Sequence, residues 1–309
     1  MMVYRELSSL AMDLGFSPRA LYSVSYHRNS HYRKVQIPKA NGEFRELSVP
    51  DEFLKSIQRN IASKLLAFEE ISPFATAYCS GGSTKKNASP HVGKHVILKL
   101  DIRHFFDNII YPMVKDKVFP AERYSEANRV LLTMLCMHRD ALPQGAPTSP
   151  VISNIIMKDF DNVIGQWCRE QQIEFTRYCD DMTFSGDFDP KPVIQMVKRE
   201  LRKLGFFLND KKTTVVRDGQ KKTVTGIVVN EKANVPSGYR RKLRQELYYC
   251  GKYGLKNHML RQNLQLTEER YLCQLLGRVN YVLQITPDDS EMRLCKDWLL
   301  TVNKETPCF

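Results

Sequence analysis

Residues 176–186 read TRYCDDMTFSG, in which two short strand-like runs enclose the adjacent acids Asp180 and Asp181. In a straight strand adjacent side chains point to opposite faces, so two neighbouring acids share one site only where the backbone turns. The stretch therefore predicts a β-hairpin with both acids at its bend. Carboxylates in an apolar run are costly unless they are paired or bind a metal. A metal site is the functional interpretation, and an ordinary Asp-containing turn is the alternative.

A third acid, Asp101, stands in HVILKLDIRHFF, residues 95–106. It closes an apolar run, so we expect it at the C-terminal end of a strand, with its side chain facing a central cleft. A helix N-cap is the alternative. Magnesium prefers oxygen ligands, and two metal ions held by carboxylates can clamp the attacking and leaving oxygens of a phosphoryl transfer. The three acids are thus candidates for holding two Mg²⁺ ions, or Mn²⁺, which also takes oxygen ligands.

The charge balance favours a polyanionic partner. The chain has 309 residues with 46 Lys and Arg against 34 Asp and Glu, a formal charge of +12. The excess is concentrated in residues 191–222 and 236–261. This distribution indicates nucleic acid as the first candidate, and a basic protein without such a partner is the alternative.

No membrane or export signal is expected from the sequence. The chain has no run of 18 apolar residues, and its first residues carry acids without a long apolar core. The eight cysteines form no CxxC pair, so zinc-finger spacing is absent. We therefore expect a cytoplasmic protein with reduced thiols.

The order of elements predicts an α+β fold up to about residue 236 and a helical unit from there on. Residues 31–50 are expected to form a hairpin, because Asn41-Gly42 lies between two strand-like runs. A helix-like segment is expected after Asp101, and KTVTGIVVN, residues 222–230, is expected to be one strand. Periodicity predicts further helices in residues 1–30, 51–70, 121–139, 151–172, 191–206, 239–250, 267–285 and 290–304.

Taken in order along the chain, the motifs resemble those of reverse transcriptases. Tyr178-Cys179-Asp180-Asp181 is similar to the family's Tyr-x-Asp-Asp hairpin, and LDIRHFF carries the strand acid. LPQGAPTSPVISN, residues 142–154, and GFFLNDKKT, residues 205–213, resemble two further segments of the family. The resemblance implies a right-hand polymerase with three parts: N-terminal helices and fingers in residues 1–94, a palm in 95–236 that includes part of the fingers at about 112–150, and a helical, RNA-binding thumb in 237–309.

The resemblance also implies roles for single residues. Asp101, Asp180 and Asp181 would be the catalytic acids and, with the backbone carbonyl of Ile102, the ligands of the two Mg²⁺ ions. Phe106, five residues after the first acid, would be a steric gate against a ribose 2′-OH, and a plain core aromatic is its alternative. The nucleotide-binding candidates are Lys39 and Arg45 on the expected fingers hairpin, Phe106, Gln144, Gly145 and, near the leaving pyrophosphate, Lys212.

A narrower resemblance is to retron reverse transcriptases. NASPH, residues 87–91, and VTG, residues 224–226, are similar to two elements of that group, and Cys179 stands where many members carry Ala. The resemblance implies RNA contact by Asn87 and His91, and a loop hydrogen bond is the alternative for His91. The expected thumb helix adds basic residues that would grip RNA phosphates between tyrosines that could stack: Arg240, Arg241, Lys242, Arg244 and Lys252.

The resemblance implies an RNA-directed DNA polymerase of a retron, which copies its cognate structured non-coding RNA into multicopy single-stranded DNA from dNTPs. Priming from a 2′-OH would give a branched RNA–DNA product, and a separate effector protein would complete an anti-phage defence system. The alternatives are a reverse transcriptase of another bacterial group, similar to group II intron or diversity-generating enzymes, or an RNA-binding scaffold without catalysis.

Overall fold

The structure is a computed structural model that describes residues 3–38 and 42–305. The chain forms two compact units. The first contains Met1–Gly82 and Leu98–Val215, and the second contains Ser83–Ile97 and Val216–Phe309. The expected fingers, palm and thumb segments stay a prediction, because this division groups residues only by their contacts.

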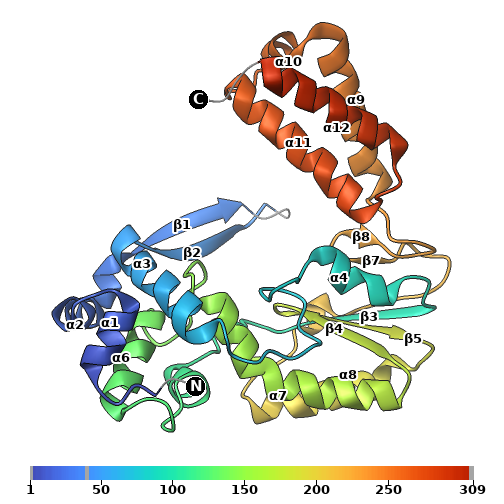
Figure 1. Ribbon diagram of the computed structural model, residues 1–309. Coiled ribbons are helices and arrows are strands. Elements are labelled where there is room, and N and C mark those ends of the chain that lie inside the picture. The colour runs from blue at the N-terminus through green and yellow to red at the C-terminus, as the bar shows by residue number, and fades with distance from the viewer. Residues whose placement is uncertain (1–2, 39–41, 306–309) are drawn as a thin grey trace. The chain divides into compact units, whose positions relative to one another are not determined.

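The first unit contains short N-terminal helices, a two-stranded hairpin and most of a four-stranded sheet (Figure 1). A π-helical turn, Ile61–Leu66, extends its third helix. Its helices and strands are α1 (Leu7–Leu14), α2 (Pro18–Tyr26), β1 (Tyr32–Pro38), β2 (Phe44–Pro50), α3 (Glu52–Asn60), β3 (Val96–Asp101), α5 (Tyr111–Val118), α6 (Glu126–Cys136), α7 (Ser149–Glu170), β4 (Glu174–Tyr178), β5 (Asp181–Gly186), α8 (Pro190–Lys203) and β6 (Thr214–Val216).

The hairpin expected in residues 31–50 is confirmed. Strands β1 and β2 pair antiparallel, with Val35 opposite Leu47. Helix α3 follows directly, and its first turn is fixed by the Asp51 side chain, which accepts a hydrogen bond from the amide of Leu54. Of the expected turn, Ala40 and Asn41 lie outside the described residues, as does the nucleotide-binding candidate Lys39.

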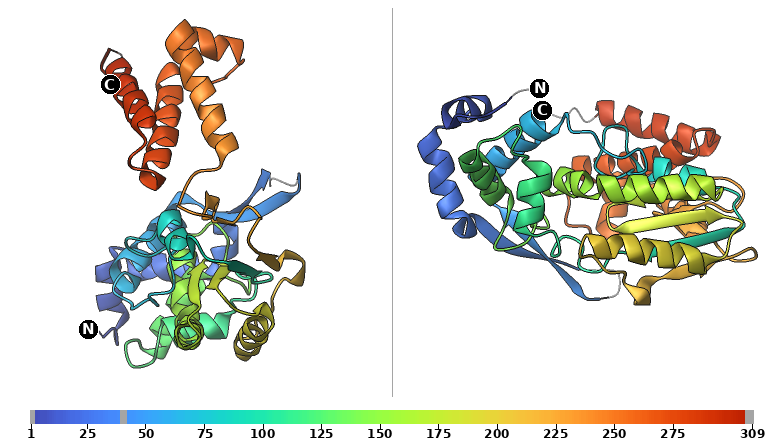
Figure 2. Two further views of the ribbon diagram at one scale, coloured as in Figure 1. Left: turned by 90° about the vertical axis from the view of Figure 1, so that its right-hand side faces the viewer. Right: turned by 90° about the horizontal axis from the view of Figure 1, so that it is seen from below.

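The larger sheet has the strand order β4-β5-β3-β6, with β4 and β5 antiparallel. Helices α7 and α8 lie side by side across one face of it (Figures 1 and 2). This arrangement places the C-terminal end of β3 beside the start of β5. The acids expected at those two points therefore become neighbours.

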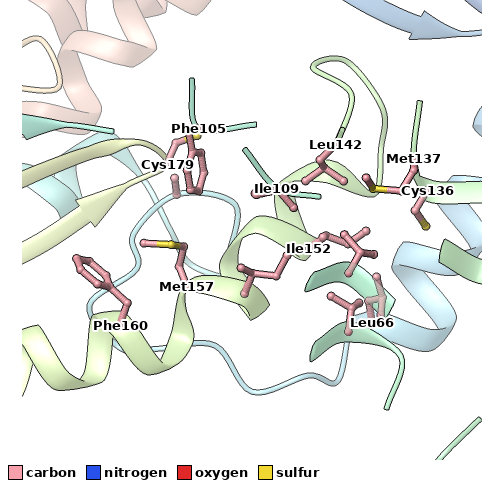
Figure 3. Packing of buried hydrophobic residues seen from close by; sticks show 14 of the residues in the cluster. Leu66, Phe105, Ile109, Cys136, Met137, Leu142, Ile152, Met157, Phe160 and Cys179 are labelled. Atoms are coloured by element: carbon pink, nitrogen blue, oxygen red, sulfur yellow. The ribbon is translucent and has the colours of Figure 1, made fainter. Parts of the chain in front are cut away.

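The core of the first unit lies between this sheet and the helices. Figure 3 shows Met157 and Phe160 of α7 facing Phe105 and Cys179, which come from the chain just after β3 and from the β4–β5 turn. Each fully buried side chain of this size stabilises the fold by roughly 1.5–3 kcal/mol. The turn that carries the paired acids is thus anchored in the core by its own cysteine.

The second unit is mainly helical and also contains a short hairpin. Helices α11 and α12 pack against each other, and α9 contacts α10 and α11. The apolar core of the unit includes Leu247, Val279 and Leu299. Its elements are α4 (Thr84–Ala88), the 3₁₀ turn Ser89–His91, β7 (Thr223–Val224), β8 (Ile227–Val228), α9 (Ser237–Tyr253), α10 (Leu255–Arg261), α11 (Glu268–Ile285) and α12 (Ser290–Glu305).

Two sequence-based expectations were wrong. Residues 222–230 do not form one strand, because Thr225 (φ 45°) and Gly226 (φ 82°) adopt left-handed backbone and fold the segment into the β7–β8 hairpin. No helix follows Asp101 directly. His104 has φ 49°, and the chain makes turns until α5 begins at Tyr111. Within the described residues, no helix is long and apolar enough to cross a membrane.

Candidate active site

The expected hairpin at residues 176–186 is confirmed. Tyr178, the last residue of β4, pairs with Asp181, the first of β5, so that Cys179 and Asp180 form the bend. Cys179 has φ 62°, a left-handed conformation, and only 6% of its surface is exposed. Burial raises the pKa of its thiol to about 12, so it is a packing group rather than a thiolate.

Asp101 is the last residue of β3, as expected, and is nearly buried. Its Oδ2 accepts a hydrogen bond from Lys212 Nζ at 2.7 Å, and its Oδ1 accepts one from Asn209 Nδ2 at 3.2 Å. The amide of the next residue, Ile102, donates to the carbonyl of Asp180 at 3.1 Å. The end of β3 is therefore tied directly to the bend that carries the other two acids.

All three acids line one cleft of about 960 Å³ in the first unit. A second hollow, between α2 and α6, is lined mainly by apolar side chains, so the polar cleft is the better candidate for an active site. The cleft also holds four of the predicted residues and several that were not predicted. Its lining includes Ile102, Arg45, Phe106, Gln144, Lys212, Tyr78, Tyr178 and Asn209.

The charges in the cleft act on one another. Loss of hydration, and then the charges of Asp180 and Asp101, raise the pKa of Asp181 to about 6, although solvent reaches part of this side chain. The hydrogen bond to Asp101 raises the pKa of Lys212, which stays positively charged. Burial lowers the pKa of Lys99, and the charge of Asp181 opposes that shift. The cleft thus gathers negative charge that Lys212 only partly balances.

Within the described part of the chain, no group of three or more His, Cys, Asp or Glu side chains is arranged to hold a metal ion. Both oxygens of Asp101 already have partners in Lys212 and Asn209. The donor set still fits a divalent cation, because the charges of Asp101 and Asp180 disfavour ionisation of Asp181 and a cation would relieve that repulsion. Such an ion would compete with Lys212 for Asp101.

The nucleotide side of the cleft joins two segments that are distant in sequence. The amide of Ser48 on β2 donates to the carbonyl of Gln144 at 2.9 Å. Gly145 has φ 122°, and a Cβ at this position would lie 3.0 Å from the Ser48 carbonyl oxygen. Only glycine allows this close approach without strain. Phe106 is partly buried and meets Phe105 edge to face, with ring centroids 5.3 Å apart.

The residues of NASPH and VTG meet in the second unit. Asn87 Nδ2 donates to Thr225 Oγ1 at 3.4 Å, and Thr225 Oγ1 donates to the carbonyl of Thr84. Asn87 is 1% exposed and His91 is 0% exposed. Neither side chain offers surface to an RNA in this structure, so the RNA contact expected of them stays a prediction.

The basic residues of α9 fall into two groups. Arg240 pairs with Asp289 at 2.8 Å, and Arg244 pairs with Glu291 at 2.6 Å, so both tie α9 to the start of α12. Arg241 and Lys242 are exposed and form no ion pair with any described residue. Lys252 lies over the rings of two tyrosines. The second group is the one available to a polyanion.

The sequence profile of the family described as "Reverse transcriptase (RNA-dependent DNA polymerase)" matches residues 37–236, more than half of the chain. Retron Mx65 reverse transcriptase of Myxococcus xanthus is 31% identical over 313 residues, covering 94% of this chain and 70% of the relative. The chain belongs to the retron-type reverse transcriptases. Retron Ec83 reverse transcriptase of Escherichia coli is also 31% identical and covers 69% of this chain and 73% of its own.

The family assignment makes the chain an RNA-directed DNA polymerase, whose template is RNA. Enzymes of this family generally use divalent metal ions. The α+β fold class, with antiparallel strands and a helical C-terminal region, is confirmed. A solved telomerase structure from Candida albicans covers 87% of this chain and 63% of its own at 12% identity, and its TM-score of 0.48 is too low to add to the assignment.

Sequence reasoning missed three residues of this reverse transcriptase's cleft. Lys99 stands two residues before Asp101, and side chains two apart on a strand share a face, so this residue was open to prediction. Asn209 lies within the quoted GFFLNDKKT segment, but its bond to Asp101 depends on tertiary structure. Tyr78 has φ 58° and no local signal marks it. Its phenol lies beside Cys179, and burial is the main cause that raises its pKa.

Proposed function

We propose that Asp101, Asp180 and Asp181 hold two Mg²⁺ ions, or Mn²⁺, with help from the backbone carbonyl of Ile102. There the enzyme would join dNTPs to a primer that is paired with an RNA template. One observation carries this proposal: three carboxylates, from the end of β3, the β4–β5 turn and the start of β5, line one cleft that also holds Lys212.

The reaction is attack of a primer hydroxyl oxygen on the α-phosphorus of a dNTP, which forms a phosphodiester bond and releases pyrophosphate. When bound, the metal ions lower the pKa of the hydroxyl and neutralise charge on the phosphate. Lys212, held at the cleft by Asp101, supplies positive charge for the departing pyrophosphate. Arg45 suits bidentate contact with the triphosphate, a role also proposed for Lys39.

The remaining cleft residues would orient the nucleotide. Phe106 stands on the cleft wall with its ring held against Phe105, where it would exclude a ribose 2′-OH. Gln144 and Gly145 would support the incoming nucleotide, because the hydrogen bond from Ser48 fixes their backbone against β2. The nucleotide site would thus be built jointly by the hairpin and the loop before α7.

The identity of the relatives supports a more specific proposal. The enzyme would copy its cognate structured non-coding RNA into multicopy single-stranded DNA, with priming from a 2′-OH and a branched RNA–DNA product. An effector protein encoded separately would complete an anti-phage system. The relatives carry the name of retron reverse transcriptases, and the Asn87–Thr225 contact joins the two retron-like elements into one structural feature.

RNA binding is proposed for the second unit. Arg241, Lys242 and Lys252 would contact phosphates, and the exposed Tyr248 and Tyr249 would stack on bases or sugars. Arg240 and Arg244 would act by holding α9 against α12 rather than by gripping RNA directly. Asn87 and His91, both buried, would shape the RNA-binding surface from beneath.

The test is the nucleic acid that co-purifies with the protein when it is expressed with its native flanking DNA. Wild type, Asp180→Ala and the control Asp187→Ala, an exposed acid beyond β5, are compared on a gel after RNase or DNase treatment. We expect DNA linked to RNA in wild type and control and its loss in Asp180→Ala. Linked DNA in all three would overturn the metal-site assignment. RNA alone in all three would overturn the retron proposal.

A further inference from the structure

Arg177 is a fully buried arginine directly beneath the catalytic turn. It lies on β4, three residues before Asp180, and its side chain is 0% exposed. Nε and Nη2 donate to the two carboxylate oxygens of Asp161 at 2.7 and 2.6 Å, and Nη2 also donates to Asn154 Oδ1 at 3.1 Å. Asp161 and Asn154 stand seven residues apart on one face of α7 and are also fully buried.

The remaining nitrogen of this guanidinium reaches the turn itself. Nη1 donates to the carbonyl oxygen of Cys179 at 2.8 Å. That carbonyl shares one planar peptide unit with the amide of Asp180. On the other side of Asp180, its own carbonyl accepts the bond from the amide of Ile102. Both peptide units that flank Asp180 are therefore fixed, one by Arg177 and one by the end of β3.

The backbone of Arg177 is held as firmly as its side chain. Its amide donates to the carbonyl of Phe74, and its carbonyl accepts from both the amide and the hydroxyl of Thr76. Asn154 Nδ2 closes the network by donating to the carbonyl of Ala77 at 2.8 Å. The guanidinium is thus a rigid bracket between α7, the 74–77 segment and the turn.

Stability alone does not account for this arrangement. Removing two charges from water costs several kcal/mol per ion, and a buried ion pair can often be replaced by apolar side chains without loss of stability. Arg177 does have one contact that an apolar pair could not supply, the hydrogen bond to Cys179. The left-handed conformation of Cys179 (φ 62°) is uncommon for a side chain of this kind and needs such support.

We propose that Arg177 is a positioning residue, which holds the Cys179 carbonyl and thereby keeps Asp180 and Asp181 in the orientation that catalysis needs. The inference rests on the catalytic role proposed for Asp180. Arg177 does not touch the reacting atoms and acts through the turn.

The decisive variant is Arg177→Met combined with Asp161→Leu, which removes the buried charges together and leaves the Cys179 carbonyl without its donor. We expect this variant to fold, with kcat lower by roughly 10- to 100-fold, because small misplacements of reacting groups have effects of this size. KM for dNTP should change little, since Arg45, Gln144 and Phe106 are untouched. A purely structural role predicts wild-type kcat in the folded variant.

A second readout is independent of activity. In hydrogen exchange followed by mass spectrometry, the peptide that spans residues 176–186 should exchange faster in the variant, while peptides from α8 stay unchanged. Arg177→Lys provides a second test if the double variant does not fold, because lysine keeps the buried charge but lacks the fork of donors. The matched control is Arg129→Lys, which alters an ion-paired arginine that does not contact the turn.

A folded variant with wild-type kcat and wild-type exchange at residues 176–186 would overturn the inference. Asp180→Ala separates this outcome from a failure of the proposed function. If Asp180→Ala still polymerises, the catalytic assignment fails. If Asp180→Ala is inactive while the Arg177 variants behave as wild type, only the positioning role fails.

Discussion

Acidification should destabilise the second unit through His91. This histidine is 0% exposed in the 3₁₀ turn after α4, and burial, followed by the nearby charge of Lys94, lowers its pKa to about 3. The folded unit therefore holds His91 neutral over most of the acid range. An unfolded histidine titrates near pH 6.5, so the unfolded state takes up a proton that the folded state refuses.

The size of the effect follows from the two pKa values. Stability falls wherever the unfolded state binds more protons, which here is the window between about pH 6.5 and about pH 3. The slope in that window approaches about 1.4 kcal/mol per pH unit, so that at pH 5 the loss relative to pH 8 is about 2 kcal/mol. Above pH 6.5 His91 should make no difference to the pH dependence.

The chain offers a clean probe for this measurement. Its two tryptophans are divided between the units, with Trp167 on α7 in the first and Trp298 on α12 in the second. In a Trp167→Phe background, fluorescence during urea unfolding reports the second unit alone. The His91→Gln variant should lose about 2 kcal/mol less than the parent between pH 8 and pH 5. Groups that titrate in both proteins cancel in this difference.

The control is His95→Gln, in the same segment, because the His95 side chain is largely exposed. It should follow the parent closely. Equal losses in His91→Gln and the parent would show that His91 is protonated in the folded unit or reached by water. The reasoning that places a neutral histidine beneath the retron-like elements would then be wrong.

Three further predictions concern the cleft and the RNA-binding helix. Gly145→Ala should lower the melting temperature and raise KM for dNTP, because its Cβ would press on the Ser48 carbonyl, whereas Gly219→Ala, with φ 79° and no atom within 4 Å, should show only the backbone strain. Phe106→Ala should reduce discrimination against rNTPs in single-nucleotide extension, with dNTP incorporation largely retained. Changing Arg241 and Lys242 to Gln should weaken RNA binding and flatten its salt dependence by about 0.7 in slope per lost contact with single strands, whereas changing Arg240 and Arg244 should mainly lower the unfolding temperature.

Local patterns were sufficient where a short stretch determines its own conformation. The hairpin at residues 31–50 followed from two strand-like runs around a turn sequence, and the helices followed from their periodicity. The same reasoning failed for residues 222–230, because a run rich in Val indicates strand character but not where Gly226 reverses the chain. It also failed after Asp101, where His104 adopts a left-handed conformation that no residue preference indicates.

The candidate site divides in the same way. Asp101, Asp180 and Asp181 were placed together because each stands where a strand ends or the backbone turns, and such positions meet at one edge of a sheet. The pairing of Asp101 with Lys212 and Asn209 was not accessible, because it joins positions more than a hundred residues apart. The burial of Asn87 and His91 was not accessible either, since a short motif does not reveal whether its side chains face solvent or core.

Arg177 shows most clearly why sequence reasoning stopped where it did. In a chain with 46 basic residues, one more arginine next to Tyr178 reads as part of the positive surface. The alternation of β4 even hinted otherwise, because Phe175 and Arg177 share a face and Phe175 is buried. What could not be read was the partner, since Asp161 lies on a helix whose pattern gives no reason to bury an acid. Two charges that are each improbable in a core become intelligible only as a pair, and their joint position under Cys179 connects them to the acids of the turn.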